Sequence, residues 1–224
     1  MIIAGLDPSL RQFGWAVIDT RASMKKRCIA RGRFKTLPVT LFIDRYIFLR
    51  EELRSLLREF TPDRVGIEYP IFNDLYSEGM YGLFLYSCEA LRTERMDTVF
   101  FSPPQVKAHA REFLGRPKGW KMAKPDMVEA AKAHTGGKGR WNHNEADAYW
   151  VASSAARFWL YYDGLLEIDA LTPVEKKEFL NLHTYVRGKK AGRTVRSGML
   201  FREDDRFFLW SEEGKIDGEE KEHD

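Results

Sequence analysis

Apolar runs and turn residues alternate over the first twenty positions in a pattern that predicts a β-hairpin. Residues 2–6 form a short apolar run with the length of a buried strand, and residues 13–18 form a second run that would return beside it. Asp7, Pro8 and Ser9 supply turn chemistry between the two runs. Asp7 therefore lies at the exit of a buried strand, where it is either an ordinary turn residue or a metal-binding carboxylate on a rigid scaffold.

Strand and helix patterns then alternate along the chain. Residues 27–35 fit an edge strand with charges facing solvent, and residues 43–60 carry one apolar stripe of helical period. Residues 64–68 repeat the first pattern, an apolar strand that ends in an acid, Glu68. Further helices are predicted over 73–95, 103–114, 125–134 and 144–161, with a strand over 98–101.

Three regions follow from these patterns. Residues 1–162 have the alternating character of one α/β domain. Residues 163–210 are expected to form a small α+β extension, with a helix start at Thr172-Pro173-Val174-Glu175 and a weak strand pair near its end. Residues 211–224 contain seven acidic and two basic residues, and we expect a disordered tail there.

Composition points to a soluble protein with a basic body. Hydrophobic residues make up 44% and charged residues 31% of the 224 positions. There is no apolar run of membrane-spanning length and no signal-peptide pattern, so a cytoplasmic location is expected. Two cysteines, Cys28 and Cys88, make neither a disulfide framework nor a zinc ligand set. Without the last fourteen residues the chain has 34 basic and 26 acidic residues, which fits a polyanionic partner.

Five short motifs, in order, resemble those of the RuvC-type Holliday junction resolvases, which belong to the RNase H-like nucleases. They are Gly5-Leu6-Asp7-Pro8-Ser9 followed by Gly14-Trp15-Ala16-Val17, Gly66-Ile67-Glu68, Gln105-Val106-Lys107, Lys124 before a helix, and Asn144-Glu145-Ala146-Asp147-Ala148. Each motif is weak alone, but their order is specific, and the match covers about residues 1–157. The resemblance implies an α/β, RNase H-like fold: a mixed five-stranded sheet flanked by helices. The C-terminal extension lies outside that family core, which suggests a divergent member, of the kind that a phage could encode.

The chemistry of such a nuclease accounts for the acids. Phosphodiester hydrolysis needs an activated water and stabilisation of the leaving oxygen, and two hard cations about 4 Å apart supply both. Asp7 is placed to lie between two ions, with Glu68 on one and Asp147 on the other, and the resemblance implies the same division. The predicted cofactor is Mg²⁺, two ions per site, with Mn²⁺ able to substitute.

The fourth ligand departs from the family pattern. Many relatives carry Asp or His three residues before the helix aspartate, where this chain has Asn144, preceded by His143. Both lie about one helical turn from Asp147 and could face the site, whereas Glu145 should point elsewhere. We favour Asn144 as a neutral ligand, with His143 second. The alternative is that Asn144 caps the helix and Asp147 occupies its third position.

Several residues are candidates for DNA contact. Lys107 and Lys124 match family lysines and would contact phosphates, although solvated helix charges are the ordinary reading of a lysine. Tyr69, Ile71 and Phe72 follow Glu68, and an aromatic ring there could stack on an unpaired base at a junction centre, unless these side chains are core. The remaining basic candidates, in loops, are Lys118, Lys121, Lys138 and Arg140.

The predicted function is a metal-dependent, structure-selective DNA endonuclease, a hydrolase of the crossover junction type, acting on branched DNA and above all on four-way junctions in recombination or repair. One alternative is a relative that binds branched DNA without cutting, and another is an RNase H-like nuclease with a different nucleic-acid substrate. An actin-like ATPase opens with a similar hairpin, but it needs further glycine motifs over a much longer chain.

A four-way junction needs two cuts, so a two-fold homodimer is also predicted. The helix over 73–95 is the expected contact, because it has more apolar residues than one core-facing stripe requires: Tyr81, Leu83, Phe84, Leu85, Tyr86, Cys88 and Leu91. Gly79 and Gly82 would allow close helix approach. The alternative is a helix buried on two sides by its own domain and the C-terminal segment.

Overall fold

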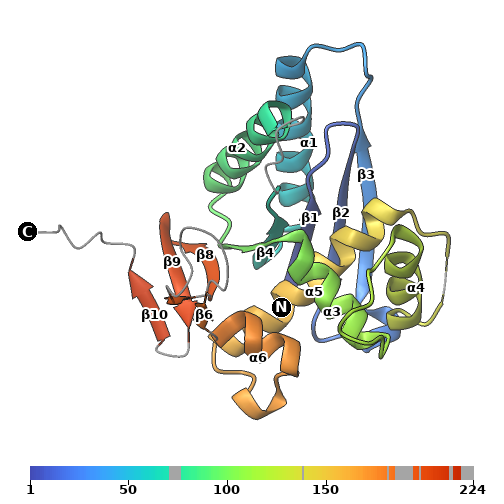
Figure 1. Cartoon of the computed structure of the whole chain (residues 1–224). Helices are drawn as coiled ribbons and strands as arrows, with labels where there is room; N and C mark the ends of the chain where they lie inside the picture. Colours follow the sequence, from blue (N-terminus) through green and yellow to red (C-terminus); the bar gives the residue numbers. More distant parts are fainter. Residues whose placement is uncertain are drawn as a thin grey trace, which may run out of the picture.

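A mixed sheet of eight strands organises the computed structural model, which describes residues 1–70, 77–137, 139–180, 182–184, 194–196, 198–211 and 214–217 (Figure 1). Across the sheet the strands run in the order β10-β9-β8-β5-β4-β1-β2-β3. In chain order they are β1 (Ile2–Asp7), β2 (Gln12–Asp19), β3 (Cys28–Lys35), β4 (Arg64–Glu68), β5 (Thr98–Phe101), β8 (Met199–Glu203), β9 (Arg206–Ser211) and β10 (Gly214–Asp217).

Strands β1, β4 and β5 are parallel to one another, β2 runs antiparallel to β1, and β3 runs antiparallel to β2. The register places Leu6 beside Ile67, and Glu68 beside Phe101. The carboxyl ends of the three parallel strands therefore meet at one edge of the sheet, which is where open α/β sheets place their ligands.

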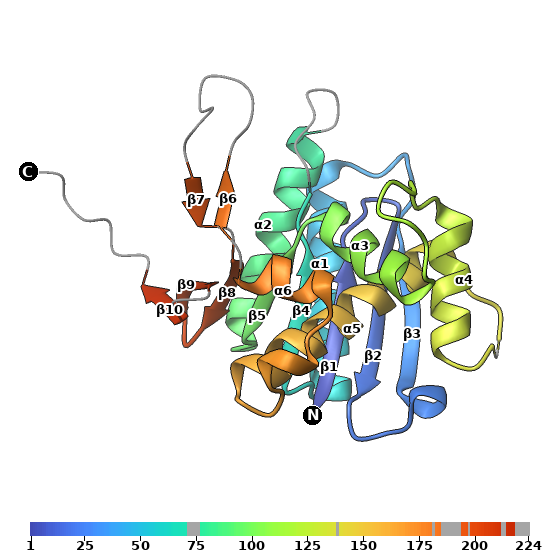
Figure 2. The same cartoon turned by 60° about the horizontal axis from the view of Figure 1, so that its bottom comes forward.

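Helices cover both faces of the five strands β5, β4, β1, β2 and β3 (Figures 1 and 2). Helices α1 (Phe42–Phe60) and α2 (Ser77–Thr93) pack on one face, through a core that contains Leu49, Leu83 and Ile67. The other face carries α3 (Pro103–Phe113), α4 (Lys124–His134) and α5 (His143–Tyr162). Helix α6 (Pro173–Leu180) and two 3-10 turns, Met24–Lys26 and Ile168–Ala170, complete the helical elements of the described residues.

Helix α5 lies unusually close to the sheet because glycines face it. A Cβ atom on Gly5 would stand 2.2 Å from the carbonyl oxygen of Ala148, and one on Gly66 would stand 2.6 Å from Ala155 Cβ. Real Cβ atoms do not approach so closely, so these positions admit only glycine while α5 stays where it is. The carboxyl half of β1 and the first turns of α5 are thereby held in backbone contact.

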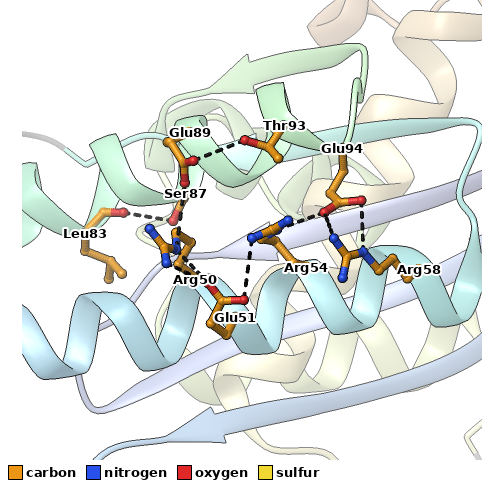
Figure 3. A network of polar contacts seen from close by, with 9 residues as sticks. All are labelled: Arg50, Glu51, Arg54, Arg58, Leu83, Ser87, Glu89, Thr93 and Glu94. Atoms are coloured by element: carbon orange, nitrogen blue, oxygen red, sulfur yellow. Dashed lines mark hydrogen bonds and ion pairs between the residues drawn. The ribbon is translucent and has the colours of Figure 1, made fainter.

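A network of ion pairs joins α1 to α2 on the opposite face (Figure 3). Glu94, just beyond the end of α2, accepts from Arg54 at 2.8 Å and from Arg58 at 2.7 Å. Arg50 lies 3.8 Å from Glu89 of α2 and 2.7 Å from Glu51 of its own helix. The acidic side chains Glu89 and Glu94 at this end of α2 are thus paired with arginines of α1.

The predicted five-stranded core is present, but the C-terminal region adds to it. Strand β8 pairs with β5 in antiparallel fashion, with Val99 beside Phe201, and β9 and β10 continue the same sheet. We expected only a weak strand pair here, because alternation in this region is poor. Strand β10 (Gly214–Asp217) is paired with β9 and falls within the region where we expected a tail, of which residues 212–213 and 218–224 lie outside the described residues.

Other element boundaries agree with the sequence to within a few residues. Helix α2 was predicted to begin at residue 73, but 71–76 lie outside the described residues and the helix is described from Ser77. A two-stranded sheet, β6 (Leu182–Thr184) with β7 (Thr194–Arg196), stands apart from the main sheet. Among the helices that the structure describes, none has the length and apolar character needed to cross a bilayer.

Candidate metal and nucleic-acid site

Asp7 and Glu68 end the two central parallel strands and point to the same side of the sheet. Leu6 and Ile67, one residue earlier in each strand, pack into the core beneath α1 and α2. Because side chains alternate between faces along a strand, Asp7 and Glu68 point to the opposite face, toward α5. The parallel pairing of Leu6 with Ile67 brings the two acids side by side at the sheet edge.

Helix α5 supplies the third acid. Asp147 lies in its second turn, next to Ala146 and Ala148, which are both fully buried against the sheet. The backbone contact between Ala148 and Gly5 fixes this turn of α5 beside the end of β1. Three carboxylates that are far apart in the sequence are therefore held at one place by two strands and a helix.

The electrostatics confirm that the three acids lie near one another. Burial, followed by the negative charges of Glu68 and Asp147, holds the pKa of Asp7 well above its usual range. Burial and the charge of Asp147 raise the pKa of Glu68 to about 8. Burial raises the pKa of Asp147 to about 6, against the opposing effect of two lysines. Without a cation, burial and the neighbouring negative charges therefore favour protonation of Glu68 at neutral pH.

The donor set suits a hard cation. Asp147 Oδ1 is buried and has no hydrogen-bond partner, an arrangement that is costly unless something positive contacts the oxygen. Carboxylate oxygens are the ligands that Mg²⁺ and Mn²⁺ take. Across the described residues, however, no three His, Cys, Asp or Glu side chains converge closely enough to enclose a single ion. The acids are neighbours, and the pairs Asp7 with Glu68 and Asp7 with Asp147 each offer part of a ligand set.

Two lysines face this group of acids, as the motifs predicted. Lys107 of α3 lowers the pKa of each of the three carboxyls, and Lys124 at the start of α4 lowers that of Asp7 and Asp147. Both side chains are exposed, so their ammonium groups remain accessible at the mouth of the site. An exposed positive charge beside a metal site is suited to hold a phosphate.

His143 lies beside Lys124. Its Nε2 atom is 3.3 Å from Lys124 Nζ, so a neutral imidazole can accept a hydrogen bond from the ammonium group. Partial burial, Lys124 and Arg33 all lower the pKa of His143, which favours the neutral ring. The Nε2 atom of His143 is thus engaged by Lys124.

Asn144 is not the helix cap that the alternative reading required. The cap is Asn142, whose Oδ1 accepts from the backbone N–H of Asn144 at 3.0 Å, and Glu145 completes the capping box. The Asn144 side chain is buried, and its Nδ2 donates to the backbone carbonyl of Gln12 at 2.7 Å. Because Nδ2 makes this hydrogen bond, Oδ1 is the Asn144 atom that could contact a cation. The spacing of Asn142 and Glu145 is itself a capping signal that the sequence contained.

Residues that sequence reasoning missed surround this helix start. Glu145 lies 3.3 Å from Arg31 Nε and 3.6 Å from Arg33 Nε, while Arg33 also donates to the side chain of Gln12 at 2.6 Å. These contacts tie the first turn of α5 to β2 and β3. No local signal in the sequence could have revealed the pairs of Glu145 with Arg31 and Arg33, because each pair joins positions more than a hundred residues apart.

The predicted DNA-contacting residues have mixed outcomes. Tyr69 follows Glu68 directly and is 37% exposed, so its ring is accessible at the sheet edge. Lys118 and Lys121 are exposed in the loop between α3 and α4, and Arg140 is exposed just before α5. Ile71, Phe72 and Lys138 lie outside the described residues.

Comparison with known proteins finds relatives of the RuvC type. The chain is 26% identical over 128 residues to the crossover junction endodeoxyribonuclease RuvC of Synechocystis sp., across 56% of this chain and 74% of that relative. RuvC of Rickettsia prowazekii is 33% identical over 73 residues, which are 33% of this chain and 46% of the relative. No family model matches the chain.

Solved structures extend the likeness to the fold. A structure described as T. thermophilus RuvC in complex with Holliday junction substrate matches with a TM-score of 0.59 and 19% identity, over 72% of this chain and 96% of that chain. A further Thermus thermophilus RuvC structure matches with the same TM-score and 20% identity, over 73% and 97%. The predicted RNase H-like fold and the resemblance of the chain to RuvC-type proteins are both confirmed.

Proposed function

We propose that this chain, a relative of the RuvC-type Holliday junction resolvases, is a metal-dependent endonuclease that cuts phosphodiester bonds in branched DNA. The observation that carries the proposal is the meeting of Asp7, Glu68 and Asp147 at the carboxyl edge of the sheet, with Lys107 and Lys124 beside them. Burial raises the pKa of all three acids, and neighbouring negative charges add to this for Asp7 and Glu68, at a cost to folding that a binding site for cations would explain.

Two Mg²⁺ ions, or Mn²⁺ in their place, would be held by pairs of these acids, with Asp7 contributing to both pairs. When bound, they supply an activated water and stabilise charge on the leaving oxygen. Asn144 would offer a neutral oxygen next to Asp147, and Gln12 holds the side chain in the orientation that this requires. Lys107 and Lys124 would bind the phosphates on either side of the cut, and His143 would keep Lys124 in place.

The substrate that we propose is the four-way junction, because the relatives named above are crossover junction enzymes and one neighbouring structure holds such a junction. Tyr69 is available to stack on an unpaired base at the junction centre, and the exposed Lys118, Lys121 and Arg140 would contact the backbone. Two cuts in opposing strands require two sites, so we also propose a homodimer.

A cleavage assay on labelled four-way, flap and linear duplex DNA, with Mg²⁺, Mn²⁺ or EDTA, tests this proposal. Paired nicks in the four-way junction that need a divalent cation are the expected result. Equal cutting of linear duplex would point to an RNase H-like nuclease of broader substrate range. Tight junction binding without cutting in either metal would instead favour a non-cutting relative, for which the neutral Asn144 is the motivating feature.

A further inference from the structure

A cavity lies among the helices on the α5 face of the sheet, beyond the three acids. Helix α3 contacts α4, α5 and α6 on this face (Figure 2). The cavity measures about 450 Å³, and small-molecule sites occupy about 300–1,000 Å³. Arg27, which lines it, directly precedes Cys28, and Cys28 is in register with Ile18 and through it with Ile3. Asp7 is roughly 13 Å further along β1, at about 3.3 Å per residue. The Arg27 end of the cavity is therefore separate from the acids.

Three hydrogen-bond donors in the lining of this cavity have no partner within the described residues. Trp150 and Ser154 of α5 are 4% and 1% exposed, yet Trp150 Nε1 and Ser154 Oγ make no hydrogen bond there. The Nε atom of Arg27 is also buried without an acceptor. A buried donor is costly unless an acceptor contacts it, so the grouping of three around one cavity points to a ligand that supplies acceptors.

Arg27 brings an unpaired positive charge to one end of the cavity. In the part of the chain that the structure describes, its guanidinium makes no ion pair with an acid. Burial, and then the charge of Arg27, lower the pKa of His134 to about 4. The His134 ring is therefore neutral at pH 7 and near the guanidinium, but it cannot balance the charge of Arg27. This end of the cavity is suited to an anionic group.

The acids of the lining are at the other end, toward α6, and both are engaged. Glu175 accepts from Arg157 at 2.7 and 2.8 Å. Glu112 accepts from the backbone N–H of Val174 at 3.3 Å, and a carboxylate has capacity for a further hydrogen bond. Since Arg157 lies two helical turns beyond Trp150, the two ends are about 10 Å apart along α5. The cavity is thus polarised, with a free cation at one end and acceptors at the other.

Aromatic rings line the side of the cavity between α3 and α5. The His134 ring stacks on Trp150, with centroids 5.0 Å apart and planes inclined by 13°. The ring of Phe113 lies 4.6 Å from that of His134. Phe113 is 44% exposed, so its ring remains uncovered beside the cavity and a flat ring of a ligand can pack on it.

We propose that this cavity binds a nucleoside monophosphate, with its phosphate at Arg27 and its base against Phe113. A phosphate supplies the acceptors that the three donors lack, and a guanidinium group pairs with phosphate through charge-assisted hydrogen bonds. Glu112 is placed to accept from an amino group of the base. The volume leaves room for the sugar and base that an inorganic ion lacks. This site does not depend on the proposed nuclease, although α3 carries both Lys107 and part of the cavity wall.

Isothermal titration calorimetry on the full chain, in EDTA and without DNA, tests the proposal with dAMP as the probe. Deoxyadenosine lacks the phosphate and inorganic phosphate lacks the base, so each should bind at least tenfold more weakly than dAMP. Equal binding of dAMP and inorganic phosphate would overturn the assignment of the base to the aromatic wall. A chain that binds no dAMP at millimolar concentration would overturn the whole proposal.

Two variants place the bound nucleotide in this cavity. Arg27→Gln should raise the dAMP dissociation constant at least tenfold, because it removes the free cation. Arg21→Gln is the matched control, since Arg21 lies in the same connection between β2 and β3, is 69% exposed and does not line the cavity. Ser154→Ala keeps the test independent of folding: it removes a hydroxyl without a partner, so Tm should not fall, whereas the dissociation constant should rise several-fold. Binding that neither Arg27→Gln nor Ser154→Ala weakens would overturn the proposal.

DNA offers the same phosphate and base, so competition separates the two sources. A four-way junction should not displace dAMP, and Arg27→Gln should bind the junction as wild type does. Displacement of dAMP by the junction would assign the cavity to DNA and overturn its assignment to a free nucleotide. Binding of dAMP by a chain that cuts no DNA would refute the nuclease and leave this site standing, and metal-dependent cutting by a chain that binds no dAMP would refute this site alone.

Discussion

Replacing Asp7 by Asn should abolish cleavage and, in metal-free buffer, stabilise the fold. Asp7 faces two other acids, and like charges about 4–6 Å apart repel by roughly 3–4 kcal/mol at an effective dielectric constant of about 20. Protonation of Asp7 and Glu68, whose pKa values are raised by burial and by the neighbouring acids, reduces this repulsion at pH 8, so we expect a gain of about 1–3 kcal/mol. For a chain of this size that is a rise in Tm of about 3–10 °C in EDTA.

The stabilisation should depend on pH in a defined direction. Glu68 has a pKa of about 8 in the folded chain and an ordinary value when unfolded, so the folded state binds the extra proton between these values. Metal-free stability of the wild type should therefore fall as pH rises from about 5 to 8. Asp7→Asn should flatten this fall, because one of the interacting charges is gone.

Thermal melts in EDTA and in Mg²⁺, run beside junction cleavage, provide the measurement. Wild type should gain Tm with Mg²⁺ and Asp7→Asn should not, while its junction affinity stays within a few-fold because basic residues elsewhere bind the phosphates. Asp169→Asn is the control, since Asp169 is 98% exposed. If Asp7→Asn melts like the control under every condition, or cuts within a few-fold of wild type, the assignment of Asp7 as the shared ligand is wrong.

Three further predictions concern the same site and the chain end. Asn144→Asp should lower the Mg²⁺ concentration needed for half-maximal cutting and Asn144→Ala should raise it, whereas His143→Ala should mainly weaken substrate binding; a metal titration in which both alanine variants behave alike would contradict this. Lys124→Ala should reduce junction affinity and the slope of affinity against salt by about one charge, measured by fluorescence anisotropy. Removing residues 218–224, which hold four acidic residues and one basic residue, should strengthen DNA binding at low salt, because their net negative charge competes with phosphate for the basic body, and equal affinities of the shortened and full chains at low salt would refute this competition.

The sequence could predict the five-stranded core and its three acids because those signals are local. A short apolar strand that ends in an acid can be recognised within about ten residues of sequence. The apolar stripe of α1 can likewise be recognised within the helix itself. The motif order then linked Asp7, Glu68 and Asp147, which the structure brings together at the sheet edge.

Contacts between distant positions could not be read in the same way. The pairing of β8 with β5 brings Phe201 against Trp159 and Tyr162 of α5. The sequence of neither strand indicates which strand it pairs with. The orientation of Asn144 depends on a carbonyl 132 positions away. Gly82 was expected to allow the close approach of a helix from a partner, but it faces the Tyr46 ring of α1 in the same chain. A glycine in a helix does not reveal which helix approaches it.

The close contact of α5 with β1 has a consequence for how this protein can change over time. In most cores the spacing between elements is set by side chains, so it drifts as those side chains are exchanged. Here the spacing between Asp7 and Asp147 is set by direct contact between the backbone of β1 at Gly5 and the backbone of α5 at Ala148. The hydrophobic interior can therefore be extensively rebuilt around the acids without moving them. Replacing Gly5 by alanine would push α5 away from β1 and so separate Asp7 from Asp147, even in a chain that still folds.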